Sequence, residues 1–183
     1  GGPQKVGVAC ADIFTGLYAV IAIQAALAER ARSGEGQHID MALLDTQVSV
    51  LANQAMNYLV SGQSPRRMGN AHPNIVPYQD FPTADGHVII AAGNDGQFQR
   101  LCRLLGLAAL AEHPDYRTNK DRVRNRDRLV ALIAAETCKF ERAELLAALE
   151  ENVVPAGPIN SLADVFDDPQ VQARGLRLDL PSA

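Results

Sequence analysis

The longest apolar segment lies near the start of the chain and predicts a helix over residues 11–32. No charged residue occurs from Ile13 to Ala28, and apolar side chains recur around much of the helical circumference. Arg30 and Arg32 fall in the last predicted turn, and Gly34 follows as a C-cap. The uncharged stretch is shorter than the roughly 20 residues that a membrane-spanning helix needs. We therefore expect a helix buried inside a protein, and no membrane association.

Shorter patterned segments lead from this helix to residue 73. Residues 37–43 alternate well enough between polar and apolar side chains to predict a strand. A second helix is predicted from about Asp45 to Leu59, and it stops near Gly62. Residues 61–73 are rich in glycine, proline and polar side chains, which indicates a crossing between two subdomains.

The second half of the chain begins with a predicted β-hairpin. Its strands cover Ile75–Phe81 and His87–Ala92, and the dipeptide Asp85-Gly86 between them is a hairpin signal. Helical patterns follow at residues 95–105, 121–137 and 141–151. The sequence therefore predicts strands and helices in one compact region.

The last predicted elements are an extended segment and a short helix. Residues 153–159 contain Pro155 and Pro158, which forbid a helix there. Ser161 is the expected N-cap of a helix that runs through Phe166. The chain is thus predicted to be mixed α/β, with a small α/β domain over residues 66–165 flanked by parts of another domain.

Composition narrows the class of protein. The 183 residues are 47% hydrophobic and 21% charged, which is typical of a globular protein with a real core. The net charge of −4 does not indicate the basic surface that binds nucleic acid or an anionic membrane. We therefore expect neither as a partner.

The cysteines and the chain ends indicate a cytoplasmic protein and a longer polypeptide. Cys10, Cys102 and Cys138 fit neither a disulfide framework nor a zinc pattern, and no metal site is expected. Nothing near residue 1 resembles a signal peptide. The ends Gly1-Gly2-Pro3 and Pro181-Ser182-Ala183 read as cuts through a longer chain.

Asp12 is the first candidate for chemistry, and two interpretations stay open. An aspartate in the first turn of an apolar helix caps that helix and complements its dipole. Alternatively, the helix start holds an ionised carboxylate in a partly desolvated place, where it acts as a nucleophile.

The second candidate is Gly93-Asn94-Asp95-Gly96-Gln97, directly after a predicted strand and before a helix. Two glycines permit positive φ and a close approach of the backbone to a ligand. An ordinary strand-to-helix connection is the equally plausible alternative.

Two further polar segments favour structural explanations. His72, which precedes a proline in a polar loop, could act as an acid or base but more often forms hydrogen bonds in a turn. The run from Lys120 to Arg128 interleaves opposite charges, which predicts a solvated helix surface rather than a phosphate site.

The order of seven segments resembles the family III coenzyme A transferases, also called the carnitine dehydratase and bile-acid-inducible (CaiB/BaiF) group. The likeness spans almost the whole chain, and the middle segments are most similar to members that transfer coenzyme A between dicarboxylic acids such as succinate and glutarate. The segments are ADIFTGLYA (11–19), RSGEGQHID (32–40), LANQAMNYL (51–59), GNAHPNIVPYQ (69–79), GNDGQF (93–98), VPAGPIN (154–160) and DPQV (168–171).

The resemblance implies roles for the candidate residues. Asp12 corresponds to the nucleophilic aspartate of the family, and Leu43 to a strand-end position near the bound thioester. The loop Gly93–Gln97 corresponds to a glycine-rich loop that closes over the active site. Some relatives have a loop of glycines only, whereas Asn94 and Asp95 stand here, a difference that bears on substrate choice and loop mobility.

The resemblance also implies a fold and partners. The family subunit is a two-domain α/β protein, and two subunits interlock as a homodimer. Residues 1–65 would be part of the large domain, 66–165 the small domain, and 166–183 a return towards the large one. The upstream half of the family, with most contacts to coenzyme A, has no counterpart in this chain. No permanently bound cofactor is implied, because the coenzyme A thioester is a substrate, and the carboxylic acid is the second one.

The implied mechanism needs neither ATP nor a metal. Asp12 attacks an acyl-CoA to give a mixed anhydride, and the thiolate then converts it to an aspartyl-CoA thioester. An anhydride hydrolyses readily, so a lid over the site is expected to exclude water.

Two alternatives remain open at the level of sequence. An α-methylacyl-CoA racemase shares the fold and the aspartate, but its relatives tend to carry glycines where Ile13-Phe14-Thr15 follow here. The second alternative is an inactive truncated fragment. Even if the complete protein is an enzyme, we expect this chain alone to be inactive.

Overall fold

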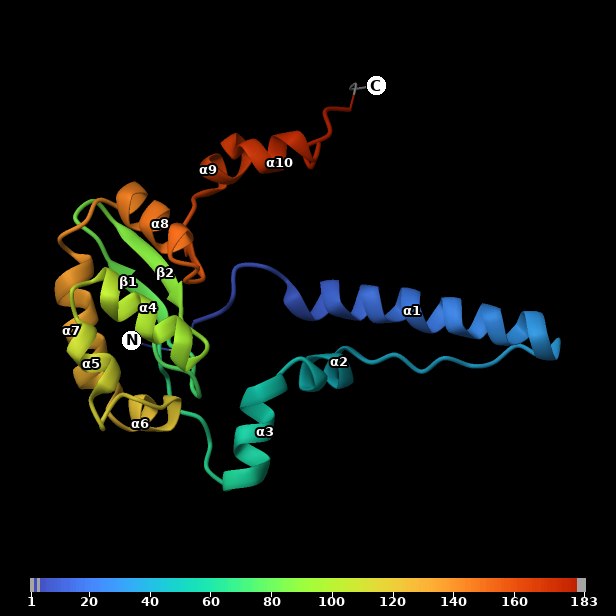
Figure 1. Ribbon diagram of the computed structural model, residues 1–183. Helices are drawn as coiled ribbons and strands as arrows, with labels where there is room; N and C mark the ends of the chain where they lie inside the picture. The colour runs from blue at the N-terminus through green and yellow to red at the C-terminus, as the bar shows by residue number, and fades with distance from the viewer. Residues whose placement is uncertain (1, 3, 181–183) are drawn as a thin grey trace. The chain divides into compact units, whose positions relative to one another are not determined.

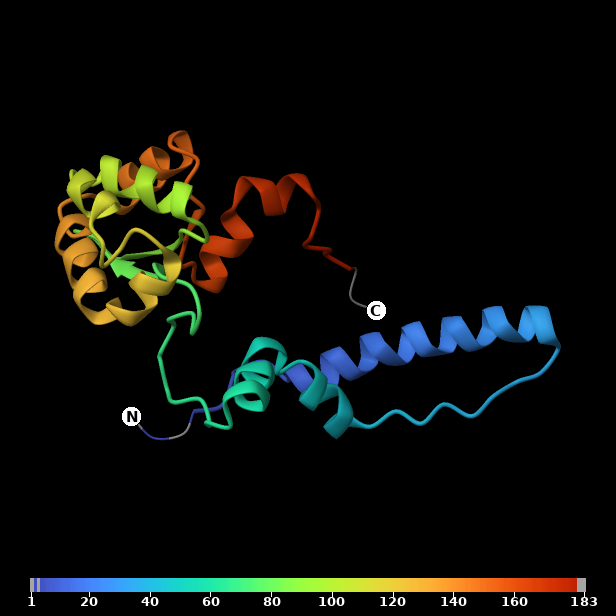
Figure 2. The ribbon, with the colours of Figure 1, turned by 60° about the horizontal axis from the view of Figure 1, so that its bottom comes forward.

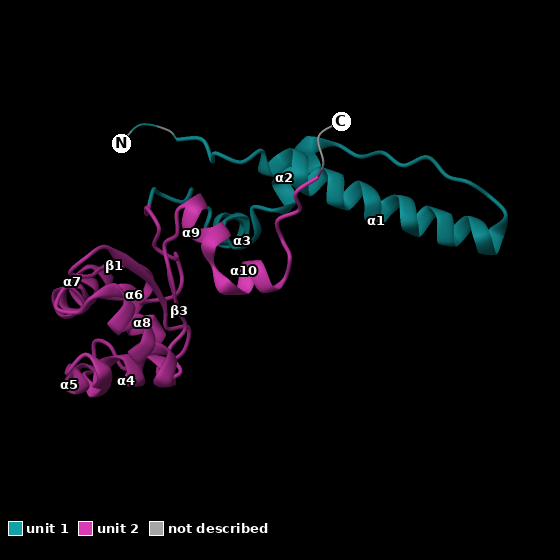
Figure 3. Ribbon diagram, turned by 90° about the horizontal axis from the view of Figure 1, so that it is seen from above, with its two compact units in different colours: residues 1–67 teal, residues 68–183 magenta. Residues whose placement is uncertain are grey.

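The computed structural model describes residues 2 and 4–180, so the sequence ends discussed above lie partly outside the described residues. The chain divides into two compact units between Arg67 and Met68, namely residues 1–67 and 68–183 (Figure 3). Each unit is described by itself. The mixed α/β character predicted from sequence is confirmed.

The first unit begins with the long helix α1 (Cys10–Ser33), which confirms the predicted helix to within one residue at each end (Figure 1). It ends as the sequence predicts. Gly34 adopts the left-handed conformation with φ 80°, and its N–H donates to the carbonyl of Arg30 at 2.8 Å. Local sequence is therefore enough to define this helix.

The surroundings of α1 differ from the expectation of a buried helix. Within the described chain none of its residues is buried, and Leu17 and Ile21 stay 57% and 62% exposed, although α2 packs along it. By length and composition alone α1 is also apolar enough to cross a membrane. The same test is passed by core helices of globular proteins, whose apolar faces are covered by other parts of the molecule.

Two predictions in the first unit are wrong in detail. Residues 37–42 run as extended backbone without a strand partner among the described residues, so the predicted strand 37–43 is absent. The predicted helix 45–59 is two helices, α2 (Leu43–Ser49) and α3 (Ala52–Ser61). Ala52 has a positive φ of 47°, which is incompatible with one continuous helix.

The second unit is built on an antiparallel sheet of order β1-β2-β3. Strands β1 (Tyr78–Pro82) and β2 (His87–Ala91) form the predicted hairpin, with Phe81 opposite Val88. Strand β3 (Ala156–Pro158) lies within the predicted extended segment and pairs with β2 on its other side. Both predictions are confirmed.

Helices pack around this sheet (Figure 2). Asn125 separates α6 from α7 within the helix predicted over 121–137, and its side-chain amide donates to the carbonyls of Asp115 and Asp121 at 3.0 and 3.1 Å. The short helix α5 was not predicted, since five residues show too little periodicity. The helices are α4 (Asp95–Leu104), α5 (Ala108–Glu112), α6 (Asn119–Arg124), α7 (Arg126–Thr137) and α8 (Arg142–Glu151).

The core of the second unit comes from both hairpin strands and from α4, α5, α7 and α8. It includes the thiol of Cys102, whose pKa burial raises to about 12, so this cysteine stays protonated. The other main members are Phe81, Val88, Ile90, Phe98, Leu101, Ala111, Leu129, Ile133, Leu145 and Leu149.

Two short helices follow β3. Ser161 caps α9 (Leu162–Asp167), as predicted, and forms a reciprocal capping box with Asp164. The hydroxyl of Ser161 and then its backbone N–H lower the pKa of the Asp164 carboxyl. Helix α10 (Pro169–Ala173), capped by Asp168, was not predicted.

Candidate active site

Asp12 lies in the first turn of α1, three positions after the N-cap residue Ala9. Its side chain is exposed, and no hydrogen bond or ion pair to its carboxylate exists among residues 2 and 4–180. The helix therefore has no side-chain cap at this end. Asp12 therefore does not cap the helix through its side chain, and its structural effect is the interaction with the helix dipole.

Leu43 is the first residue of α2 and is 52% exposed. It follows the extended segment 37–42, so the position is a helix start and the predicted strand end is absent. A hollow of about 370 Å³ between α1 and α2 is lined by other residues, namely Tyr18, Ile21, Ala22, Met41, Asp45, Thr46 and Ser49.

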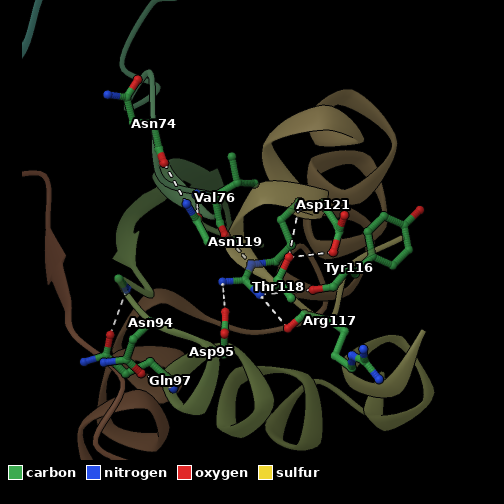
Figure 4. Close-up of polar contacts among 12 residues, drawn as sticks. Asn74, Val76, Asn94, Asp95, Gln97, Tyr116, Arg117, Thr118, Asn119 and Asp121 are labelled. Carbon is green, nitrogen blue, oxygen red and sulfur yellow. Dashed lines mark hydrogen bonds and ion pairs between the residues drawn. The ribbon is translucent and has the colours of Figure 1, made fainter. Parts of the chain in front are cut away.

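The Gly93–Gln97 turn connects β2 to α4, and two side chains brace it (Figure 4). The side-chain oxygen of Asn94, the N-cap, accepts from the N–H of Gln97 at 2.9 Å. The side-chain oxygen of Gln97 in turn accepts from the N–H of Gly93 at 2.7 Å. These reciprocal bonds make the segment a capped helix start.

The two glycines of this turn do not use their conformational freedom. Neither Gly93 nor Gly96 has a positive φ, and an added Cβ would meet side-chain atoms at ordinary distances of 3.5 Å or more. The geometry therefore matches the ordinary strand-to-helix connection that the sequence left open as an alternative. A role in covering a ligand stays a prediction.

Asp95 forms an ion pair with Arg122, with 2.8 Å between its Oδ1 and the arginine Nη2. The Arg122 side chain is fully buried, and its guanidinium lies 4.5 Å above the ring of Phe98. Sequence reasoning missed this contact. The buried side of α6 carries no signal that distinguishes Arg122 from its exposed neighbours.

The expectation of a solvated Lys120–Arg128 run is therefore wrong for part of the run. Arg122 is buried, and Arg126 donates to the carbonyls of His72 and Pro73 at 2.8 and 2.9 Å. Arg124 and Arg128, with side chains 66% and 71% exposed, do face solvent. Tertiary packing places alternate arginines in different environments because successive helical positions face different directions.

His72 takes part in a hydrogen-bonded turn. Its Nδ1 accepts from the N–H of Asn74 at 3.1 Å, and its ring stacks on Tyr78 with 5.1 Å between centroids. The backbone N–H of His72 donates to the carbonyl of Tyr78 at 2.9 Å. These contacts support the structural interpretation of this histidine.

A hollow of about 480 Å³ beside Gln97 was not predicted. Val153, one of its lining residues, has a positive φ of 54°, and its carbonyl and that of Asn152 accept from Arg100 at 2.9 and 2.8 Å. The lining is mainly apolar: Gln97, Leu146, Glu150 and residues 153–158.

The candidate residues thus occupy two units, with Asp12 and Leu43 in the first and the Gly93–Gln97 turn in the second. Within the described residues no group of three or more His, Cys, Asp or Glu side chains could hold a metal ion. The candidate residues offer an exposed carboxylate, at Asp12, and the backbone N–H groups at the start of α4.

Comparison with known proteins identifies the family. Residues 1–183 match CoA-transferase family III. Among similar proteins, succinate–glutarate CoA-transferase of Agrobacterium fabrum is 63% identical over 98% of this chain and 45% of its own length. Succinyl-CoA:glutarate CoA-transferase of Mus musculus is 44% identical over 98% of this chain and 41% of its own.

Solved structures give the same result. A CaiB/BaiF family protein from Brucella suis is 61% identical, with a TM-score of 0.75 over 98% of this chain and 47% of that one. A protein from Mycobacterium tuberculosis is 28% identical, with a TM-score of 0.84 over 97% of this chain and 46% of that one. The chain therefore spans less than half the length of these relatives. It belongs to CoA-transferase family III.

Proposed function

We propose that the complete protein containing this chain transfers coenzyme A from an acyl-CoA to a carboxylic acid, with dicarboxylates as donor and acceptor. The observation that carries this proposal is the 63% identity to a protein named succinate–glutarate CoA-transferase, over 98% of the chain. The remaining part of the site belongs to the region that the relatives have in addition.

In this proposal Asp12 is the nucleophile. Its carboxylate attacks the thioester carbonyl of the donor, which forms a mixed anhydride and releases the CoA thiolate. The thiolate attacks the carbonyl carbon of Asp12, which releases the donor acid and leaves an aspartyl-CoA thioester. The acceptor carboxylate displaces CoA from Asp12 to form a second anhydride, and the thiolate then takes the acceptor acyl group and restores the free carboxylate.

The position of Asp12 suits this role for two reasons. Its carboxylate is exposed and free of partners within the described chain, so a thioester can approach it. The partial positive charge at the start of α1 interacts favourably with a carboxylate in the first turn. Energy of the thioester passes through each intermediate, so no ATP is consumed.

The Gly93–Gln97 turn has the second role. In the first turn of α4 the backbone N–H groups of Asp95 and Gly96 have no intrahelical acceptor. We expect them to face the oxyanion that develops during each attack, and the turn to keep water from the anhydride. Leu43 is proposed to lie near the thioester.

Other properties of the complete protein follow from the same proposal. The thioester is a substrate, and the reaction calls for no permanent cofactor and no metal. An interlocked homodimer and a cytoplasmic location are proposed as well, on the family resemblance.

The first prediction concerns Asp12→Asn in the complete protein. We expect transfer of CoA from succinyl-CoA to labelled glutarate to fall at least about a thousandfold, since the nucleophile is lost. The matched control is Asp45→Asn, because Asp45 occupies the same first-turn position in α2 and its loss removes the same dipole interaction. We expect the control to keep its activity.

Trapping of the intermediate completes this test. Hydroxylamine or borohydride added during turnover should modify the carboxyl of Asp12, as read by peptide mass spectrometry. Modification of another carboxyl, or near-normal turnover of Asp12→Asn, contradicts the assignment. A wild-type protein that only exchanges the α-proton of its acyl-CoA would be a racemase.

A further inference from the structure

Arg122 has a buried side chain that is hydrogen-bonded on several sides. It is fully buried, and its four hydrogen bonds reach three parts of the chain. The Nε donates to the carbonyl of Val76 at 2.7 Å, and Nη1 donates to the carbonyls of Tyr116 and Arg117 at 3.0 and 3.3 Å. The remaining bond, from Nη2, goes to Asp95 (Figure 4).

Asp95 is the one carboxylate that pairs with this guanidinium among the described residues. A buried charge needs an opposite charge or several hydrogen bonds to offset its desolvation. The two side chains are unequal, because Arg122 is fully buried whereas Asp95 is 51% exposed. The arginine is thus the fixed member of the pair, and the aspartate is the member held in place.

The segment that includes Val76, whose carbonyl accepts from Arg122, is itself held by Asn119. Asn119 accepts from the N–H of Val76 at 3.1 Å and donates to the carbonyl of Asn74 at 2.8 Å. On the other side of the guanidinium, the ring of Phe98 belongs to the same helix as Asp95 and is fully buried. Arg122 therefore joins α4 to a rigid framework at two points, through an ion pair and a ring contact.

We infer that Arg122 is a positioning residue for the Gly93–Gln97 turn, acting through Asp95. Asp95 is the first helical residue after the N-cap Asn94, so the place of its carboxylate sets the direction in which the first N–H groups of α4 point. This inference rests on the proposed function, in which those N–H groups face the reacting carbonyl. In this inference the buried Arg122, which does not touch the substrate, fixes the geometry of the Gly93–Gln97 turn.

Loosening the turn has a specific chemical consequence. In the proposed reaction an anhydride on Asp12 is consumed either by the CoA thiolate, which conserves the thioester, or by water, which gives two free acids. A displaced turn admits water and misaligns the N–H groups. The ratio of hydrolysis to transfer therefore reports the position of the turn, whereas a general loss of folded protein lowers both rates together.

The test uses Asp95→Ala in the complete protein, with succinyl-CoA and glutarate as substrates. We expect kcat for transfer to fall about tenfold, the ratio of hydrolysis to transfer to rise about tenfold, and KM for succinyl-CoA to change little. Asp95→Asn, which keeps the shape and a neutral acceptor for the Arg122 guanidinium, should lie between this variant and wild type. Amide hydrogen exchange should quicken at residues 93–97 and stay unchanged in α7.

The matched control is Asp115→Ala. Asp115 is also a half-exposed aspartate of the second unit, 45% exposed, but its arginine partner at 3.8 Å is the surface residue Arg128. This variant should keep the wild-type ratio of hydrolysis to transfer. Arg122→Lys, which keeps the charge and loses the planar fork, is expected to raise the ratio if it folds.

The outcomes separate the two proposals. An Asp95→Ala protein with the wild-type ratio and unchanged exchange at residues 93–97 overturns the role of Arg122 while CoA transfer stands. A wild-type protein without CoA transfer overturns the proposed function, whereas the exchange measurement still tests whether Arg122 holds the turn.

Discussion

Asp85 links the turn between β1 and β2 to the start of α8. Its Oδ1 accepts from the backbone N–H of Arg142 at 2.7 Å and from the hydroxyl of Thr83 at 3.0 Å. The bond from the Arg142 N–H is the main cause that holds the pKa of the Asp85 carboxyl below its ordinary value of 3.8, and the Thr83 hydroxyl adds to it. A single carboxylate thus joins two elements that are distant in sequence.

This lowered pKa predicts a pH dependence. Because the folded pKa lies below the unfolded one, the stabilisation is fully present above about pH 4 and is lost as the pH falls through the folded pKa. In Asp85→Asn this part of the acid sensitivity should disappear. The measurement is amide exchange protection at Arg142, normalised for intrinsic exchange, from pH 5 to pH 2.

The control for this prediction is Asp164, whose pKa is lowered mainly by the hydroxyl and N–H of Ser161 and only last by the charge of the Arg142 side chain, without a bond to the Arg142 N–H. Asp164→Asn should leave the protection of the Arg142 amide unchanged. Equal acid sensitivity of that amide in wild type and Asp85→Asn would contradict the assignment.

At the scale of elements, the end of α1 depends on the left-handed backbone conformation of Gly34. Gly34 has a φ of 80°, and no atom lies within 4 Å of the place where a Cβ would be. Replacement by alanine therefore costs only backbone strain. The nearby Gly36 has equally open space around it and no positive φ.

These two glycines form a matched pair for mutagenesis. We expect Gly34→Ala to lower the unfolding free energy of the complete protein by about 1 kcal/mol, the cost of placing a side chain in the left-handed region. Gly36→Ala should be close to neutral. Denaturant titration of both variants measures the difference, and equal midpoints would show that α1 does not end through Gly34.

Elements differ in how far their own sequence predicts them. Helix α1 and the β1–β2 hairpin follow from apolar spacing and turn residues within a few positions. The strand predicted at residues 37–43 does not form, because alternation shows only which faces a strand would have and a partner must supply its hydrogen bonds. Similarly, the helical pattern does not signal the break at Asn125, whose side-chain amide donates to the carbonyl of Asp115 outside the helix.

At the scale of the molecule, the buried core lies in the second unit. In the first unit Thr46 is the one residue among those described that is buried, whereas residues 68–160 contain the whole hydrophobic cluster. Burial of apolar surface is the main favourable term in folding. The two units should therefore differ in whether they fold when separated.

The prediction is made for two fragments. Residues 68–160 should unfold cooperatively with heat or urea and show dispersed amide signals in NMR, because their core is complete in itself. Residues 1–67 should show no cooperative transition, since α1 lacks buried contacts of its own. A cooperative transition in residues 1–67, or the lack of one in residues 68–160, contradicts this division.

The candidate site shows the limit of sequence interpretation most clearly. Asp12 and the Gly93–Gln97 turn were found through short motifs, because an acidic first turn and a strand–turn–helix connection are local features. That the turn is a capped helix start, with no positive φ at its glycines, appeared only in the structure. The functional roles of these residues remain predictions for the complete protein.

Local patterns along the chain were sufficient for the class of fold, for most helix and strand positions and for the family resemblance, since periodicity and capping act over a few residues. The burial of Arg122 was decided by the folded structure alone. Its ionic partner lies 27 positions away, and its remaining acceptors are backbone carbonyls that any sequence provides. The charge pattern of Lys120–Arg128 looks the same whether an arginine faces water or the core, and only packing in three dimensions distinguishes them.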